Sequence, residues 1–232
     1  MEKGLRDDLA AFIKDVVNGF VDETSKAMLK LGKLIGLHKP GSSLEKLKLR
    51  PIGICEVFLK LAGSAAVHKI KDQITDYFSD QLQYGVFKKG GAEDIVHTMR
   101  RLLKFYPYLV TIDAKNAFNS ILRTCIRDEL AANPQFRAAY AMFDLECGAP
   151  ALLITPEGIQ IECTTGTRQG GTSSVFYFAL GLHPVLRALF EKFGKDEYGE
   201  YKLVIRAYLD DINLLSKCPV KMEEAEIGRA HV

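Results

Sequence analysis

Apolar residues near the N-terminus recur at the three- and four-residue spacing of a helix. Leu9, Phe12, Ile13 and Val16 follow this spacing and predict an amphipathic helix over residues 5–18, and a similar pattern predicts a second helix over 24–36. Further along, "LKLRPIGI" alternates like a strand. The turn-forming run "KPGSS" separates it from a short apolar stretch that ends at Lys39. Together these two stretches predict a basic β-hairpin.

The rest of the pattern predicts a mixture of helices and strands. Helices are expected at 56–79, 92–105, 118–132, 135–146 and 173–193, and strands at 108–114, 202–208 and 212–216, with a hairpin around Thr155–Gly158 and a tight turn at Asp210–Asp211. The strand at 108–114 reads as buried because its sequence, "YLVTIDA", is mostly apolar. This order of elements predicts an α+β fold whose antiparallel sheet is covered by helices on one face.

Composition narrows the class of protein only moderately. The chain has 232 residues, of which 47% are hydrophobic and 26% charged, which suits one large domain or two small ones. No run of about 18 apolar residues predicts a membrane-spanning helix, and the charged N-terminus lacks the apolar core of a secretory signal. The five cysteines are scattered without a CxxC pair, so we expect neither a zinc site nor a disulfide framework, and an intracellular location.

Charge is distributed unevenly along the chain. Residues 26–104 hold 15 Lys and Arg against 7 Asp and Glu, whereas the flanking segments are each slightly acidic. A basic segment beside acidic ones is typical of a polyanion partner held near a carboxylate site. A lysine-rich surface exposed to water explains the same count, and charge alone does not separate the two.

Two predicted strands carry carboxylates at an end. "LVTIDA" ends in Asp113, and "AYLDDI" holds Asp210 and Asp211 between apolar residues. If the two strands are neighbours, Asp113 and Asp210 converge with Asp211 beside them, and three carboxylates that close require a cation. Oxygen ligands select Mg²⁺ or Mn²⁺, and two such ions about 4 Å apart suit phosphoryl displacement. Alone, "DD" is more simply a polar turn.

The order of motifs "LRPI…K…QYG…DAKNAFN…RQGG…YLDD" resembles reverse transcriptases, above all those of non-LTR (LINE-type) retroelements. The resemblance extends from about Lys39 to Ser216. It implies fingers and palm of a right-hand polymerase with an antiparallel palm sheet. It also implies an RNA-directed DNA polymerase that adds dNTPs to a DNA primer on an RNA template, with two Mg²⁺ or Mn²⁺ ions.

The resemblance assigns roles to individual residues. Asp113 and Asp210 match the catalytic metal ligands, Asp211 a more peripheral carboxylate, and Ala114 a backbone ligand of one ion. Phe118 matches the aromatic gate that excludes a 2′-hydroxyl. The remaining assignments are nucleotide contacts at Arg50, Lys60, Gln169 and Gly170, and nucleic-acid contacts at Lys39, Gln83, Gly85, Lys88 and Arg168.

Simpler interpretations remain for several of these residues. Lys39 and Lys60 are equally explained as surface lysines, and Phe118 as a core residue of its helix. An RNA-directed RNA polymerase shares the two-metal palm, but viral enzymes of that kind usually have a second aspartate where Phe118 stands. A third hypothesis is that the chain is a decayed or co-opted copy of such an enzyme that only binds RNA.

The resemblance also predicts domain limits. Fingers with the N-terminal helices are expected over 1–107 and an incomplete palm over 108–218, with some interchange around 115–165. Residues 219–232 form a tail, of which 226–232, "EIGRAHV", resembles a translated sequencing-library adapter. A thumb and any endonuclease domain are expected to be missing, and the 232 residues alone to bind metal and nucleotide poorly and to have little or no processive activity. A nuclear location is expected if the element is eukaryotic.

Overall fold

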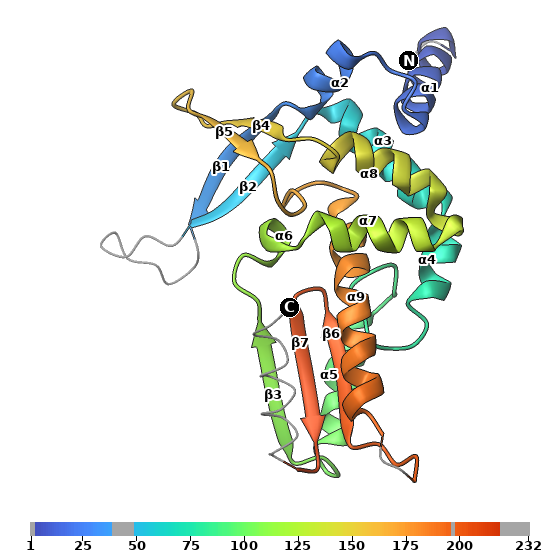
Figure 1. Ribbon diagram of the computed structural model, residues 1–232, viewed down its shortest axis with the longest axis vertical. Coiled ribbons are helices and arrows are strands. Elements are labelled where there is room, and N and C mark those ends of the chain that lie inside the picture. Colours follow the sequence, from blue (N-terminus) through green and yellow to red (C-terminus); the bar gives the residue numbers. More distant parts are fainter. Residues whose placement is uncertain (1–2, 39–48, 196–197, 219–232) are drawn as a thin grey trace. The chain divides into compact units, whose positions relative to one another are not determined.

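The computed structural model describes residues 3–38, 49–195 and 198–218. These residues form two compact units, each built from two separate stretches of the chain (Figure 1). The first unit comprises Met1–Lys71 with Phe118–Phe178, and the second comprises Asp72–Ala117 with Ala179–Val232. The predicted limits, 1–107 for the fingers and 108–218 for the palm, differ from the limits of these two units. The assignment of fingers and palm therefore stays a prediction. No helix within the described ranges is long and apolar enough to cross a membrane.

The first unit combines a four-stranded sheet with helices. Its strands are β1 (Gly32–His38), β2 (Leu49–Cys55), β4 (Ala151–Ile154) and β5 (Gln160–Cys163), in the order β2-β1-β4-β5. Its helices are α1 (Lys3–Asn18), α2 (Glu23–Lys30), α3 (Val57–Lys69), α6 (Ala117–Ser120), α7 (Arg123–Ala132), the 3₁₀ turn η1 (Pro134–Phe136) and α8 (Arg137–Cys147). Both predicted hairpins are present, and β1 pairs with β4 in parallel.

The helix predicted over 24–36 is wrong in its second half. Helix α2 ends at Lys30, and β1 begins at Gly32. Glycine disfavours a helix, and the neighbouring strands leave little room for a side chain at Gly32. A Cβ on Gly32 would lie 2.8 Å from the Cδ2 of Leu153 on the neighbouring strand. The spacing of apolar residues alone did not distinguish a helix from a strand over these residues, because a half-buried strand and a short helix can have the same apolar residues.

The second unit contains a three-stranded antiparallel sheet. Strands β3 (Tyr108–Asp113), β6 (Leu203–Tyr208) and β7 (Asp211–Ser216) are ordered β3-β7-β6. Helices α4 (Lys71–Tyr77), α5 (Gly91–Leu102) and most of α9 (Ser174–Phe193) complete the unit. The helix predicted over 56–79 is divided in two, α3 and α4, at Ile70. The mixed α+β class is confirmed.

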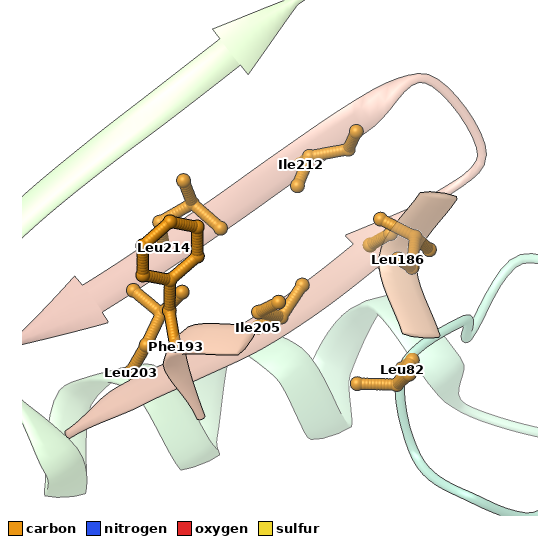
Figure 2. Packing of buried hydrophobic residues seen from close by; sticks show 8 residues of the cluster. Leu82, Leu186, Phe193, Leu203, Ile205, Ile212 and Leu214 are labelled. Atoms are coloured by element: carbon orange, nitrogen blue, oxygen red, sulfur yellow. The ribbon is translucent and has the colours of Figure 1, made fainter. Parts of the chain in front are cut away.

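Side chains alternate between the two faces of this sheet, and helices cover both faces. On one face Ile205, Ile212 and Leu214 pack with Leu186 and Phe193 of α9 (Figure 2). On the opposite face Val204 and Leu215 pack with α5 through Ile95 and Met99. The expectation of helices on a single face is therefore corrected, because the two faces of β6 and β7 are both apolar at these positions.

Strand β3 is an edge strand and is not the buried strand that its apolar sequence predicts. Val110 and Ile112 pack against the cluster formed by Ile205, Ile212, Leu214, Leu186 and Phe193, which is called the α9-side cluster below. Tyr108 and Leu109 are each 43% exposed. Burial depends on the neighbouring elements as well as on hydrophobicity, and among the described strands β3 pairs only with β7. Its residues at 109, 111 and 113 are exposed on the face opposite the cluster.

We expect the α9-side cluster to dominate the stability of the second unit. Leu214→Ala removes a side chain that is 0% exposed, and should lower the free energy of unfolding by about 2–5 kcal/mol. The measurement is urea denaturation followed by circular dichroism. Leu109→Ala, on the exposed face of β3, is the matched control and should change the value by about 0.5 kcal/mol. Equal losses in the two variants would contradict this assignment of the core.

Candidate catalytic site

The pairing of β3 with β7 places two aspartates directly opposite each other. The register runs from Tyr108 paired with Ser216 to Asp113 paired with Asp211. Directly paired residues have Cβ atoms about 4.5–5.5 Å apart. Asp113 is the last residue of β3 and Asp211 the first of β7, so both carboxylates lie at one end of the sheet.

A pocket of about 230 Å³ lies at this pair. Thr111, Asp113, Asp211 and Asn213 supply its polar lining, and they belong to the face of β3 and β7 opposite the α9-side cluster. Among the described residues, the ion pairs include neither Asp113 nor Asp211. Two like charges directly opposite each other are destabilising unless a cation lies between them. Hard divalent cations such as Mg²⁺ prefer oxygen donors of this kind, so the donor set fits such an ion.

Asp210 lies in the two-residue turn Leu209–Asp210 that joins β6 to β7. The turn was predicted one residue later, at Asp210–Asp211, but Asp211 already belongs to β7 and pairs with Tyr208. Within the described part of the chain, no three Asp, Glu, His or Cys side chains are grouped so that they could hold a metal. The register therefore pairs Asp113 with Asp211, and the metal roles of Asp210 and of Ala114, which follows β3, stay predictions.

The loop "TTGTRQGG" docks on α6 in the first unit. Thr167 N–H donates to the carbonyl of Phe118 at 2.7 Å, and Gly166 N–H donates to the carbonyl of Ile121 at 3.1 Å. A Cβ on Gly166 would clash with the backbone of Asn119, and φ at Gly166 is +65°. Only glycine fits this position, because the loop backbone touches the helix backbone. The loop is thereby fixed beside the segment that carries Phe118.

The same loop also rests on β2, the strand that carries Arg50. Gly53 N–H donates to the carbonyl of Gln169 at 3.0 Å. A Cβ on Gly170 would lie 2.9 Å from the carbonyl oxygen of Gly53. At the end of the loop, Thr172 Oγ1 donates to the carbonyl of Lys60 on α3 at 2.9 Å. All the residues that were predicted to contact the nucleotide therefore lie in the first unit. Arg50 is exposed and Lys60 is half-buried.

Phe118 has one covered face. Its ring stacks on the ring of Phe178 with centroids 4.5 Å apart and planes 19° apart, and the residue is half-buried. The stacked partner fixes the orientation of the ring, which a residue that discriminates by exclusion requires. A core role and a gating role are both compatible with this contact.

Comparison with known proteins decides the family. The model of the family described as "Reverse transcriptase (RNA-dependent DNA polymerase)" matches residues 37–226. The chain belongs to the reverse transcriptase family. The sequence is also 27% identical over 218 residues to the retrotransposable element SLACS 132 kDa protein of Trypanosoma brucei gambiense. This alignment covers 92% of the chain and 17% of that protein, so the chain spans about one sixth of its relative.

Solved telomerase structures share the fold. Apo telomerase from Candida tropicalis matches with a TM-score of 0.59 and 12% identity, covering 98% of this chain and 46% of that one. Telomerase from Candida albicans in complex with a TWJ fragment of telomeric RNA matches with a TM-score of 0.56 and 12% identity, covering 89% and 41%. The predicted fingers-and-palm fold class and the reverse transcriptase family are confirmed.

Arg168 was predicted to contact nucleic acid, but in this reverse transcriptase domain it is buried. The residue is 5% exposed, and its Nη1 donates to the sulfur of Cys55 at 3.7 Å. Its Nη2 is buried without a hydrogen-bond partner among the described residues. The loop turns Arg168 inward because its neighbours Gln169 and Gly170 pack on β2. The guanidinium therefore faces protein in this structure, and the nucleic-acid contact of Arg168 stays a prediction.

Glu146, on α8, is a buried carboxylate that sequence reasoning missed. Ser173 Oγ lies 2.7 Å and 2.8 Å from its two oxygens. Burial raises the pKa of Glu146 to about 7, against the lowering effects of the Ser173 hydrogen bond and the Arg168 charge. The available signal was a glutamate between two apolar residues, Leu145 and Cys147, in "AMFDLEC". Glu146 and the inward-facing side chain of Arg168 are thus two buried ionisable groups next to the loop backbone.

The other residues predicted to contact nucleic acid differ in how far they are exposed. Gln83 is buried, whereas Lys88 is exposed and forms a 2.9 Å ion pair with Asp94. The hydrogen bond from Lys88 is the main reason that the pKa of Asp94 is lowered. Gly85 is half-buried against Leu209, and Lys39 lies outside the described residues. The side chain of Gln83 is therefore enclosed by protein in this structure, and its nucleic-acid contact stays a prediction.

Glu146 makes the stability of the first unit depend on pH. Its folded pKa of about 7 exceeds the ordinary glutamate pKa of 4.5, so the folded chain retains a proton that the unfolded chain releases. Stability from this group therefore falls as pH rises from about 4.5 to 7. The unfolding free energy of the native chain, relative to that of Glu146→Gln, should fall by about 1–3 kcal/mol between pH 5 and 8. Urea titrations at each pH measure this difference.

Glu162→Gln, at an exposed position on β5, is the control and should keep the native pH profile. Parallel profiles for the native chain and Glu146→Gln would show that Glu146 does not titrate in this range.

Proposed function

We propose that this chain is the polymerase part of a retroelement protein and catalyses RNA-directed DNA synthesis. The carrying observation is the paired register that sets Asp113 opposite Asp211 at an accessible pocket. In the reaction, the primer 3′-hydroxyl oxygen bonds to the α-phosphorus of a dNTP. The bond from that phosphorus to the bridging oxygen breaks, pyrophosphate leaves, and the hydroxyl proton is lost.

Asp113, Asp210, Asp211 and the carbonyl of Ala114 are the groups that would hold metal. Two Mg²⁺ or Mn²⁺ ions, when bound, supply charge stabilisation of the attacking and leaving oxygens. The chain supplies the rigid frame for these ligands. Asp113 and Asp211 lie on hydrogen-bonded strands whose other faces are packed against α9, so their spacing is fixed before substrate binds.

The first unit supplies the residues that we propose contact the nucleotide. Arg50 is exposed on β2 and can bind the triphosphate through two hydrogen bonds, and Lys60 can bind it as a point charge. Gln169 and Gly170 are held by β2, which keeps the loop in one conformation for nucleotide and template. Phe118 is proposed to exclude the 2′-hydroxyl of a ribonucleotide.

An RNA template and a DNA primer are the proposed partners. The excess of basic residues over 26–104 supports this, since nucleic-acid affinity comes largely from contacts with phosphates. Lys39 and Lys88 belong to this set. One structural neighbour was solved with telomeric RNA. The cysteines are all free, which suits the reducing interior of a cell, and we propose the nucleus if the host is eukaryotic.

Replacement of the aspartates tests the proposal directly. Asp113→Asn, Asp210→Asn and Asp211→Asn should each reduce incorporation of a single dNTP on an RNA template by about 10³-fold, because a lost metal ligand removes several kcal/mol of charge stabilisation. Rapid-quench extension of a labelled primer gives the rates. Asp76→Asn, at an exposed position in the same unit, should keep the native rate. Native rates in the strand-end variants, or no incorporation by the native chain, would refute the proposal.

Phe118→Ala tests the sugar gate and the class of polymerase together. Loss of the ring should lower the ratio of kcat/KM for dNTP over rNTP by about 10- to 100-fold, because the 2′-hydroxyl is then no longer excluded. Competing incorporation of the two nucleotides measures this ratio. Phe105→Ala, a strongly exposed phenylalanine, is the control. A native preference for rNTP would instead favour an RNA-directed RNA polymerase.

A further inference from the structure

The segment 82–84 lies alongside β6 and extends the sheet of the second unit. Ala207 N–H donates to the carbonyl of Leu82, and Tyr84 N–H donates to the carbonyl of Ala207, both at 2.8 Å. Gln83 forms a parallel bridge with Ala207. This short pairing brings the motif "QYG" to the end of β6, where the Leu209–Asp210 turn begins.

The side chain of Gln83 binds both backbone groups of Leu209. Its Oε1 accepts from Leu209 N–H at 2.8 Å and from Gly85 N–H at 2.9 Å. Its Nε2 lies 3.4 Å from the carbonyl of Leu209 and donates to it. Gln83 is only 1% exposed. A buried amide with these partners holds the turn more firmly than a solvated one, because water does not compete for the bonds.

Leu209 needs such support. Its φ is +56°, in the left-handed region that a leucine rarely adopts. A conformation of this kind persists only where the surroundings fix it, and those surroundings are the Gln83 amide and Gly85. A Cβ on Gly85 would lie 2.6 Å from the Cγ of Leu209, so the glycine leaves room for the leucine side chain. Both the backbone and the side chain of Leu209 are therefore held.

The conformation of Leu209 determines where the next two residues lie. Asp210 follows it directly in the turn, and Asp211 then enters the pair with Asp113. A change at Leu209 is transmitted to both carboxylates through two peptide bonds. Misplacement of a catalytic group by about 1 Å can cost 10²-fold in rate.

We propose that Gln83 is a positioning residue of the catalytic site, which fixes Asp210 and Asp211 by holding Leu209 in its left-handed conformation. The proposal rests on the polymerase function proposed above. It gives the glutamine of "QYG" a role inside the protein in place of the nucleic-acid contact expected from sequence. Gln83 touches neither metal nor substrate in this role and acts only through Leu209.

Two replacements of Gln83 separate positioning from simple packing. Gln83→Met keeps the length of the side chain and removes every hydrogen bond to the turn. Gln83→Glu keeps an acceptor for the N–H groups of Leu209 and Gly85 and loses only the donor. Gln73→Met, at an exposed position of α4, is the control. Gly85→Ala is a second route to the same turn, because its Cβ pushes the Leu209 side chain away.

Three measurements on the full 232-residue chain are compared. Exchange of the Leu209 amide is followed by NMR with ¹⁵N-leucine, binding of Mn²⁺ alone is followed by electron paramagnetic resonance, and single-nucleotide incorporation gives kcat and KM. In Gln83→Met the Leu209 amide should exchange at least about 10-fold faster. Mn²⁺ affinity should fall, and kcat should fall by about 10- to 100-fold with little change in the KM for dNTP. Gly85→Ala should lower kcat in the same way.

Gln83→Glu should retain protection of the Leu209 amide and most of kcat, because it keeps the hydrogen-bond acceptor. If Gln83 served only to fill space, the Glu and Met variants would behave alike. The proposal is overturned if Gln83→Met folds and keeps native amide protection, or loses protection with unchanged Mn²⁺ affinity and kcat. Equal losses of amide protection and kcat in Gln83→Met and Gln83→Glu also overturn the proposal. If Gln83→Met does not fold, unchanged Mn²⁺ affinity in Gly85→Ala overturns it. If the native chain does not polymerise, the proposed function fails, and amide exchange with Mn²⁺ affinity still decides the role of Gln83.

Discussion

The pairing of β3 with β7 is the interaction on which the candidate site depends. It holds two carboxylates opposite each other at the end of a sheet, an arrangement that their mutual repulsion opposes. The apolar backs of the strands stabilise it. Val110, Ile112, Ile212 and Leu214 lie on one face, against the cluster that α9 completes. Because side chains alternate, the same burial fixes Asp113 and Asp211 on the other face.

Close backbone contacts supply the second part of the arrangement. In the first unit, Gly166 and Gly170 let one loop lie directly on α6 and on β2. In the second unit, Gly85 gives the Leu209 side chain its place beside the turn. In each case glycine is required by the contact and not merely by the flexibility of a loop. The segments that the family motifs mark are thus anchored on secondary structure.

Buried polar groups support these contacts from within the protein. The side chain of Arg168 turns inward from the loop, Ser173 donates to the buried carboxyl group of Glu146, and Gln83 is bonded to Leu209. Burial without partners would be costly for such groups, so each tends to fix the backbone around it. Residues that lie next to functional motifs in the sequence can therefore hold the backbone of the motif in place without touching the substrate.

The sequence by itself determined the family, the strand-end position of Asp113, both hairpins and most helices, because these features depend on local periodicity and on the order of motifs. It misplaced the turn by one residue, extended a helix into the first part of β1, and did not show that Arg168 and Gln83 are buried. Only the tertiary structure decided these points. The bonds of Gln83 join residues 126 positions apart, and Arg168 meets Cys55 across 113 positions. A local pattern shows that a side chain is polar, but its partner depends on which distant segment the fold brings beside it.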